Sequence, residues 1–180
     1  MRQTLILHPD SRCPAVKWIV VEVERPSATA LKLHYKLAGT IDDLLLPAWA
    51  EPVRTNELWR HTCFELFLRP NTASGYLEFN FSPSTQWAAY RFTGHKDGGS
   101  DAPDTLQPRI RFVASGEGLA LMAVIDNLPP DESWRLGLSA VIEERNRRLS
   151  YWALAHPPGR APDFHDQDCF VLEVGAADSP

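Results

Sequence analysis

Short apolar runs that alternate with polar residues limit the fold of this 180-residue chain more than any other feature of its sequence. Fifteen prolines and ten glycines separate these runs, and no long stretch has the 3.6-residue period of an amphipathic helix. We therefore predict an all-β protein with antiparallel strands. The expected strands cover residues 4–7, 16–24, 30–37, 62–69, 76–81, 86–93, 109–114, 119–126, 134–143, 149–155 and 169–174.

Some ten or eleven short strands joined by turns are typical of a β-sandwich of the jelly-roll or immunoglobulin-like kind. The length suits a single domain over residues 1–180, and 44% hydrophobic residues are enough to fill its core. Two long polar connections are expected at residues 95–104 and 156–168. Ligand sites in such folds commonly lie on loops or on one sheet face.

Charge and apolar run length exclude several classes of partner. The net charge is −5 and no basic block is present, so the charge pattern of a nucleic-acid binder is missing. The apolar run near the N-terminus is too short for a signal peptide, and no stretch is long enough to span a bilayer. We expect a cytoplasmic protein with neither nucleic acid nor membrane as partner. The cysteines Cys13, Cys63 and Cys169 lack CxxC spacing and are expected to be reduced and buried.

Alternation divides the three strands that follow Trp59, which we expect to form an antiparallel meander, into two faces. The core face is predicted to hold Phe64, Leu66, Leu68, Leu77, Phe79, Phe81, Ala88, Tyr90 and Phe92. The outer face is predicted to hold Glu65, Phe67, Tyr76, Glu78, Asn80, Trp87 and Arg91. A slip of one residue would bury all of the charged groups together, which favours this orientation.

Three interpretations of the outer face remain open from the pattern alone. Carboxylates, an amide, a guanidinium and flat rings suit a polyhydroxylated ligand, since rings pack on the C–H face of a sugar and polar groups bind its hydroxyls. The same residues could form a solvated face on which Glu65, Glu78 and Arg91 make weak cross-strand ion pairs. Glu65 and Glu78 could also act as a glycosidase pair, which requires a separation of about 5 to 9.5 Å.

Other catalytic and cofactor chemistry has weaker support in the sequence. Residues 156–169 are rich in His, Asp and Cys, but their spacing matches no metal-binding template. We interpret them instead as a loop in which Asp163 makes a turn bond and His156 and His165 pack on prolines. No GxSxG elbow and no CxxCH haem-attachment motif are present. We predict no bound metal and no cofactor, with a b-type haem as the alternative. Its candidate ligands are His61, His95, His156 and His165.

Three blocks of the sequence resemble the bacterial DOMON-like domains, which are relatives of the family 9 carbohydrate-binding modules. They read WRHTCFELFLRP, YLEFNFSPSTQWAAYRF and SYWALAHPPGRAPDFHDQDCFVLEV, and the resemblance covers nearly the whole chain. It implies a β-sandwich with a ligand site on a sheet face and its loops. Relatives bind sugars or haem, and some act in electron transfer. The calcium that the sugar modules often hold is not expected, since the loops here form no oxygen cage.

Family 9 modules clamp a sugar between two tryptophans with help from a strand glutamate, and the resemblance assigns Trp59 and Trp152 to the clamp. We predict a non-catalytic module for a small carbohydrate, such as an amino sugar or a cell-wall fragment. The alternatives are a haem-binding redox module and a glycoside-acting enzyme that uses Glu65 and Glu78. The predicted ligand-binding residues are Trp59, Glu65, Glu78, Asn80, Trp87, Arg91, Trp152 and His156.

Overall fold

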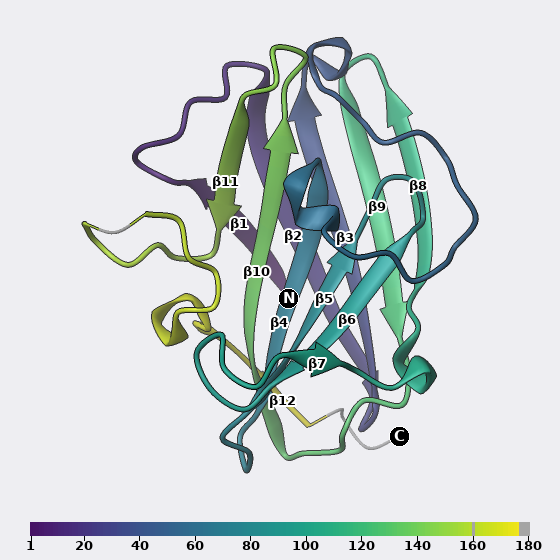
Figure 1. Ribbon diagram of the computed structural model, residues 1–180, viewed down its shortest axis with the longest axis vertical. Coiled ribbons are helices and arrows are strands. Elements are labelled where there is room, and N and C mark those ends of the chain that lie inside the picture. Colours follow the sequence, from purple (N-terminus) through teal and green to yellow (C-terminus); the bar gives the residue numbers. More distant parts are fainter. Residues whose placement is uncertain (160, 177–180) are drawn as a thin grey trace.

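Antiparallel strands form most of the regular structure in the computed structural model, which describes residues 1–159 and 161–176 (Figure 1). The strands are β1 (Arg2–Leu7), β2 (Val16–Ser27), β3 (Ala30–Gly39), β4 (Cys63–Pro70), β5 (Tyr76–Phe81), β6 (Trp87–Phe92), β7 (Ser100–Asp101), β8 (Arg109–Ser115), β9 (Gly118–Ile125), β10 (Ser133–Glu143), β11 (Leu149–Ala153) and β12 (Leu172–Gly175). Four 3₁₀ turns are also present: η1 (Ile41–Asp43), η2 (Leu58–Arg60), η3 (Asp104–Leu106) and η4 (Gln167–Cys169). No helix in these residues is long and apolar enough to cross a membrane.

All eleven predicted strands are present, and their ends differ from the prediction by at most three residues. The largest shift at a strand start is in β12, which begins at Leu172 because the residues just before it form η4. The short strand β7 was missed because it lies within the polar connection predicted as a loop. The all-β, antiparallel prediction is therefore confirmed.

The strands form one continuous sheet in the order β7-β6-β5-β4-β10-β11-β1-β2-β3-β9-β8, and β12 pairs with β10 beside this path. Strand β1 joins the two halves, since residues 2–5 pair with β2 and residues 6–7 pair with β11. The sheet curls so that β3 faces β4: the Tyr35 hydroxyl donates to the Glu65 carbonyl at 2.7 Å. The finer assignment to a jelly-roll or immunoglobulin-like sandwich stays a prediction.

The core lies between the two halves of the curled sheet. The predicted β4–β5–β6 meander and the predicted core faces of β4 and β5 are confirmed, because their apolar residues are at most 5% exposed. They pack with apolar residues of β2, β3, β9 and β10 in one cluster. Its largest fully buried members include Ile19, Leu31, Leu33, Tyr35, Phe64, Leu66, Phe79 and Trp134.

The predicted facing of β6 is wrong. Tyr90 pairs with Glu78 and Ala88 with Asn80, so Tyr90 lies on the outer face, while Trp87 and Arg91 lie on the other. Trp87 is buried in the core, where the Arg54 guanidinium lies 4.4 Å from its ring centre. Arg91 is exposed and borders a separate hollow of about 440 Å³. The turn between β5 and β6 sets this register, and alternation within β6 does not reveal it.

The outer face of β4 and β5 is covered by residues 161–171, which we call the strap. Phe164 and Phe170 of the strap pack on Phe67, with ring centres 6.5 and 5.8 Å apart. Phe170 lies over Gly137 of β10, where a β carbon would come within 2.9 Å of its ring. Glu65, on the same face of β4, is only 2% exposed. The solvated-face interpretation is therefore wrong.

Candidate functional site

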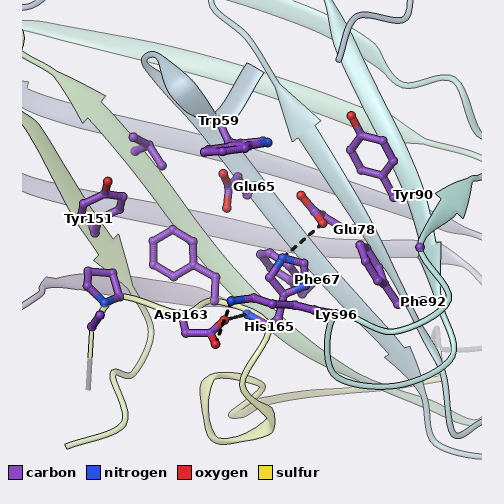
Figure 2. Close-up of a pocket in the computed structure, with 15 residues that line it drawn as sticks. Trp59, Glu65, Phe67, Glu78, Tyr90, Phe92, Lys96, Tyr151, Asp163 and His165 are labelled. Atoms are coloured by element: carbon purple, nitrogen blue, oxygen red, sulfur yellow. Dashed lines mark hydrogen bonds and ion pairs between the residues drawn. The ribbon is translucent and has the colours of Figure 1, made fainter. Parts of the chain in front are cut away.

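A cavity of about 710 Å³ opens between the outer sheet face and the strap (Figure 2). This volume is within the range of about 300–1,000 Å³ that is common for small-molecule sites. The sheet supplies polar and aromatic side chains from four strands, η2 supplies an indole, and the strap closes one side. The lining residues are Trp59, Glu65, Phe67, Glu78, Tyr90, Phe92, Lys96, Gly99, Val141, Tyr151, Ala161, Pro162, Asp163, Phe164 and His165.

Aromatic side chains form much of the cavity wall. Trp59 lies on η2 with 47% of its surface exposed, and Figure 2 shows its ring next to the Glu65 carboxyl group. Tyr90 from β6 and Tyr151 from β11 lie on opposite sides of this centre. A half-exposed indole beside polar groups offers a flat apolar surface to a ligand that also makes hydrogen bonds.

Glu65 is buried in the middle of the sheet, on β4 between β5 and β10. Its Oε2 accepts a hydrogen bond from the Ser139 hydroxyl at 3.0 Å, while Oε1 has no hydrogen bond to any described residue. Burial, and then the charge of Glu78, raise the pKa of Glu65 to about 8, although the Ser139 bond opposes the shift. At neutral pH the empty cavity therefore holds Glu65 mainly as the neutral acid.

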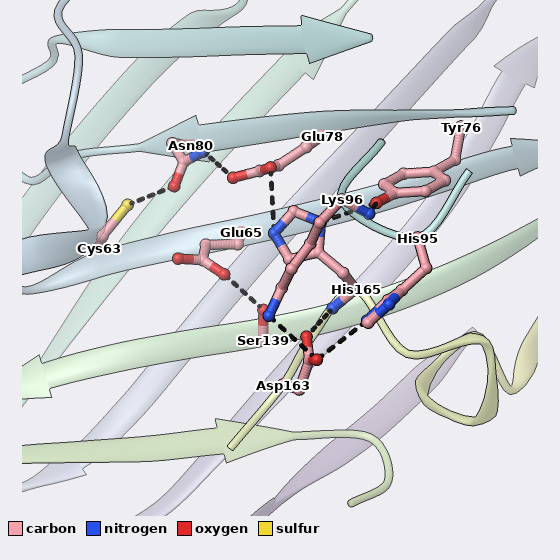
Figure 3. A network of polar contacts seen from close by, with 10 residues as sticks. All are labelled: Cys63, Glu65, Tyr76, Glu78, Asn80, His95, Lys96, Ser139, Asp163 and His165. Carbon is pink, nitrogen blue, oxygen red and sulfur yellow. Dashed lines mark hydrogen bonds and ion pairs between the residues drawn. The ribbon is translucent and has the colours of Figure 1, made fainter. Parts of the chain in front are cut away.

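Glu78 is the second carboxyl group in the cavity. Its Oε1 accepts from the Asn80 amide at 2.6 Å, and its Oε2 lies 3.6 Å from Nε2 of His165 (Figure 3). Burial raises its pKa to about 7, and the Asn80 bond opposes this shift. Asn80 in turn accepts from the Cys63 thiol at 3.5 Å, so it fixes Glu78 without lining the cavity.

His165 of the strap faces Glu78 as a neutral ring. Burial is the main cause that lowers its pKa to about 4, and the nearby charge of Lys96 adds to the effect. The Tyr76 hydroxyl accepts from the Lys96 backbone N–H at 3.3 Å and lies 2.7 Å from Nδ1 of His165. When the tyrosine hydroxyl donates to Nδ1, the proton of the neutral histidine is on Nε2, toward Glu78.

Asp163 holds the strap to the loop that follows β6. Its Oδ2 lies 3.0 Å from Nζ of Lys96 and 2.9 Å from Nε2 of His95. Burial alone would raise the pKa of Asp163, but these two partners lower it below its usual value. The ionised Asp163 therefore compensates the positive charge of Lys96 at the cavity rim.

The structure brings together only part of the predicted site. Trp59, Glu65 and Glu78 line the cavity, and Asn80 contacts Glu78. His156 lies beside the cavity, with Nε2 2.8 Å from the Ile6 carbonyl. Five of the eight predicted residues do not line the cavity: Asn80, Trp87, Arg91, Trp152 and His156.

Trp152 is buried in the core at 6% exposure, and its Nε1 donates to the Ser150 hydroxyl. The second tryptophan of the predicted clamp is therefore not in the cavity. Its neighbour Tyr151 pairs with Val141 of β10, and both side chains line the cavity. Because side chains alternate along β11, knowing that Trp152 faces the core would have placed Tyr151 on the outer face, where the cavity lies.

Several lining residues were missed by the sequence reasoning. Tyr90 was assigned to the wrong face, and Lys96 was not singled out. Asp163 and His165 were considered only as metal or haem ligands. In residues 1–159 and 161–176, no three His, Cys, Asp or Glu side chains are placed to hold a metal ion. Each of the four histidines considered for haem contacts another residue. His61 contacts Glu143, His95 contacts Asp163, His156 contacts Ile6 and His165 contacts Tyr76.

No family model and no curated protein matches the chain. Among solved structures, a protein from Bacteroides uniformis that is provisionally described as carbohydrate-binding aligns with a TM-score of 0.69. That alignment has 13% identity and covers 97% of this chain and 85% of the other.

A family 9 carbohydrate-binding module from Caldicellulosiruptor kristjanssonii is also similar. Its complex with cellotriose aligns with a TM-score of 0.60 and 12% identity, over 99% of this chain and 84% of the module. Its complex with glucose aligns with a TM-score of 0.55 and 13% identity, over 94% of this chain and 83% of the module. At this identity the likeness concerns the fold. The chain therefore shares the fold of the family 9 carbohydrate-binding modules.

Proposed function

We propose that the chain is a non-catalytic carbohydrate-binding module and that its site is the cavity beside Trp59. The observation that carries this proposal is the half-exposed Trp59 ring next to the buried Glu65, whose Oε1 has no hydrogen-bond partner among the described residues. A sugar presents an apolar C–H face and a rim of hydroxyls, which match a flat ring and a free carboxyl oxygen. Support comes from the shared fold with modules described in complex with glucose and cellotriose.

Each group in the cavity has a distinct role in this proposal. Trp59 stacks on the sugar ring, and Tyr90 and Tyr151 contact its edges. Glu65 in its neutral form both donates and accepts a hydrogen bond, which suits a sugar hydroxyl. Glu78 accepts a second hydroxyl. The ordered partners of both carboxyl groups limit the entropy lost on binding.

The finer predictions from the sequence are kept as part of this proposal. They are the DOMON-like and jelly-roll or immunoglobulin-like assignments, an amino sugar or cell-wall fragment as ligand, and a cytoplasmic location.

The two carboxyl groups favour binding over glycoside hydrolysis. A glycosidase needs one protonated acid and one ionised carboxylate, so the two pKa values must be driven apart. Here burial raises both, Glu65 to about 8 and Glu78 to about 7. Below pH 7 neither group is mainly an ionised nucleophile. Turnover of a glycoside that depends on both groups would contradict the non-catalytic proposal.

Isothermal titration calorimetry with a panel of mono- and oligosaccharides tests the proposal. We expect at least one glycan to bind, and Trp59→Ala to weaken that binding by about tenfold or more through loss of stacking. Trp49→Ala is the matched control, because Trp49 is 71% exposed and lies outside the cavity. The proposal fails if no glycan binds, or if the two variants weaken binding equally.

A further inference from the structure

Glu65 and Glu78 differ from the other buried glutamates, because neither pairs with an arginine or lysine that the structure describes. Four glutamates are buried in the part of the chain that the structure describes. Glu143 lies 3.1 Å from the Arg147 guanidinium, and Glu144 lies 2.7 Å from Arg148. Glu65 has only the Ser139 hydroxyl as side-chain partner, and Glu78 has Asn80 and the neutral His165.

Geometry directs both groups into the same space. Glu65 pairs with Asn80 and Glu78 pairs with Phe67, so the two glutamates occupy diagonal positions on one face of β4 and β5. Diagonal side chains of this kind lie about 7–8 Å apart at their α carbons and meet when they are long. Both line the cavity, and Oε1 of Glu65, which has no hydrogen bond to any residue that the structure describes, belongs to a residue that is only 2% exposed.

Within residues 1–159 and 161–176, no cation compensates this pair. Lys96 and His95 at the rim both contact Asp163 instead. Burial lowers the pKa of His165 to about 4, so its ring is neutral. The other nearby titratable groups stay neutral because burial raises their pKa values: Tyr35, Cys63, Tyr76 and Tyr90. The Tyr151 phenol also lines the cavity.

A single ammonium group fits this arrangement better than a metal ion. An ammonium has three N–H donors and forms strong charge-assisted hydrogen bonds with carboxylates. Hard divalent cations need six or more oxygen ligands, and no third His, Cys, Asp or Glu completes a metal cluster among the described residues. The Trp59 ring beside the pair adds a flat surface that attracts cations and C–H groups.

We propose that the ligand carries a protonated amine between Glu65 and Glu78, which makes a sugar with a free amino group a better ligand than its neutral or N-acetylated counterparts. This inference rests on the proposed carbohydrate function of the same cavity. Binding of the amine ionises both carboxyl groups of the pair, and the displaced protons pass to the buffer. Affinity for such a sugar therefore falls as the pH is lowered below 7, because protons then compete with the ammonium.

The test compares ligands that differ only at one substituent. Glucosamine, N-acetylglucosamine and glucose, and their β-1,4-linked dimers, are titrated at pH 6.5 into wild type and Glu65→Gln. We expect wild type to bind the amine with about tenfold or higher affinity than the other two sugars of each series. For Glu65→Gln, the affinities for the three sugars of each series should agree within about twofold. Titrations in buffers of different ionisation enthalpy should show proton release with the amine and none with glucose.

The outcomes separate the two proposals. If the amine binds no tighter than glucose and N-acetylglucosamine, or binds without proton release, the amine inference fails while the carbohydrate function stands. If no sugar binds, both fail. If Glu65→Gln keeps the full preference for the amine, Glu65 is not its partner and the inference is overturned. Circular dichroism of the variant verifies that it is folded.

Discussion

Replacing Glu65 by glutamine should change how the stability of the empty protein depends on pH. Burial raises the pKa of Glu65 from 4.5 to about 8. Between these values the folded protein keeps a proton that the unfolded chain loses, so stability falls as the pH rises. The contribution of the neutral acid is complete below about pH 4.5 and is lost progressively up to about pH 8.

The size of the effect follows from the pKa change. Each pH unit in this window costs about 1.4 kcal/mol, which sets an upper limit of about 5 kcal/mol for an isolated group. Water entry and local relaxation reduce the cost, and we expect about 2–4 kcal/mol. Glutamine has the same shape and can keep the hydrogen bond with Ser139, but it never ionises. The free energy of unfolding of Glu65→Gln should therefore equal that of wild type near pH 5 and exceed it by about 2–4 kcal/mol near pH 8.

Urea unfolding followed by tryptophan fluorescence at pH 5, 6, 7 and 8 measures the difference. Glu24→Gln is a matched control, because Glu24 is an exposed strand glutamate that pairs with Lys32. The free energy of unfolding of this control should not rise relative to that of wild type between pH 5 and pH 8. A gap between wild type and Glu65→Gln that stays constant from pH 5 to pH 8 would refute the reasoning.

Two further substitutions test the covering of the outer face and the contact between the sheet halves. Gly137→Ala places a β carbon within 2.9 Å of the Phe170 ring, so it should displace the strap, weaken sugar binding and speed limited proteolysis of the strap. Gly116→Ala is the control and should have none of these effects, because no atom lies within 4 Å of the added β carbon. Tyr35→Phe removes a buried hydrogen bond to the Glu65 carbonyl and should lower the free energy of unfolding by about 1–3 kcal/mol. Unchanged proteolysis in the first variant, or unchanged urea midpoints in the second, would contradict these expectations.

The strands could be predicted because their sequence pattern reflects burial on one face. In β3 the residues ALKLHYKLAG alternate between fully and partly buried positions over most of the strand, and the predicted range is short by only two residues. The core faces of β4 and β5 follow from the same rule, since one set of positions is wholly apolar. Alternation is therefore sufficient where the two faces differ clearly in polarity.

Alternation fails where both faces of a strand carry mixed residues. In β6, Trp87 and Arg91 share one face and Tyr90 lies on the other, so polarity does not identify the core side. The turn before β6 fixes the register, and Thr85 there has a positive φ of 77°. Trp152 was assigned to the clamp by the family resemblance and not by alternation, and its pairing with Ala140 of β10 and its burial show that it faces the core.

The strap explains why the candidate site could be only partly predicted. Its residues follow no period, and their position depends on aromatic packing against Phe67 and on the contact of Asp163 with Lys96. These are long-range contacts between irregular segments, which a local pattern does not encode. The sequence placed Glu65 and Glu78 on the correct face but could not show that both side chains are buried there and that burial raises their pKa values.

Indole N–H signals of nitrogen-15-labelled protein test most directly whether the cavity beside Trp59 binds a carbohydrate. The six tryptophans give separate probes, and the Trp59 signal is assigned by its loss in Trp59→Phe. On titration with the glycan panel, the Trp59 signal should shift in a saturable manner, while those of exposed Trp49 and buried Trp152 stay in place. A Trp59 signal that no glycan moves, or a glycan that shifts only Trp49, would contradict the claim.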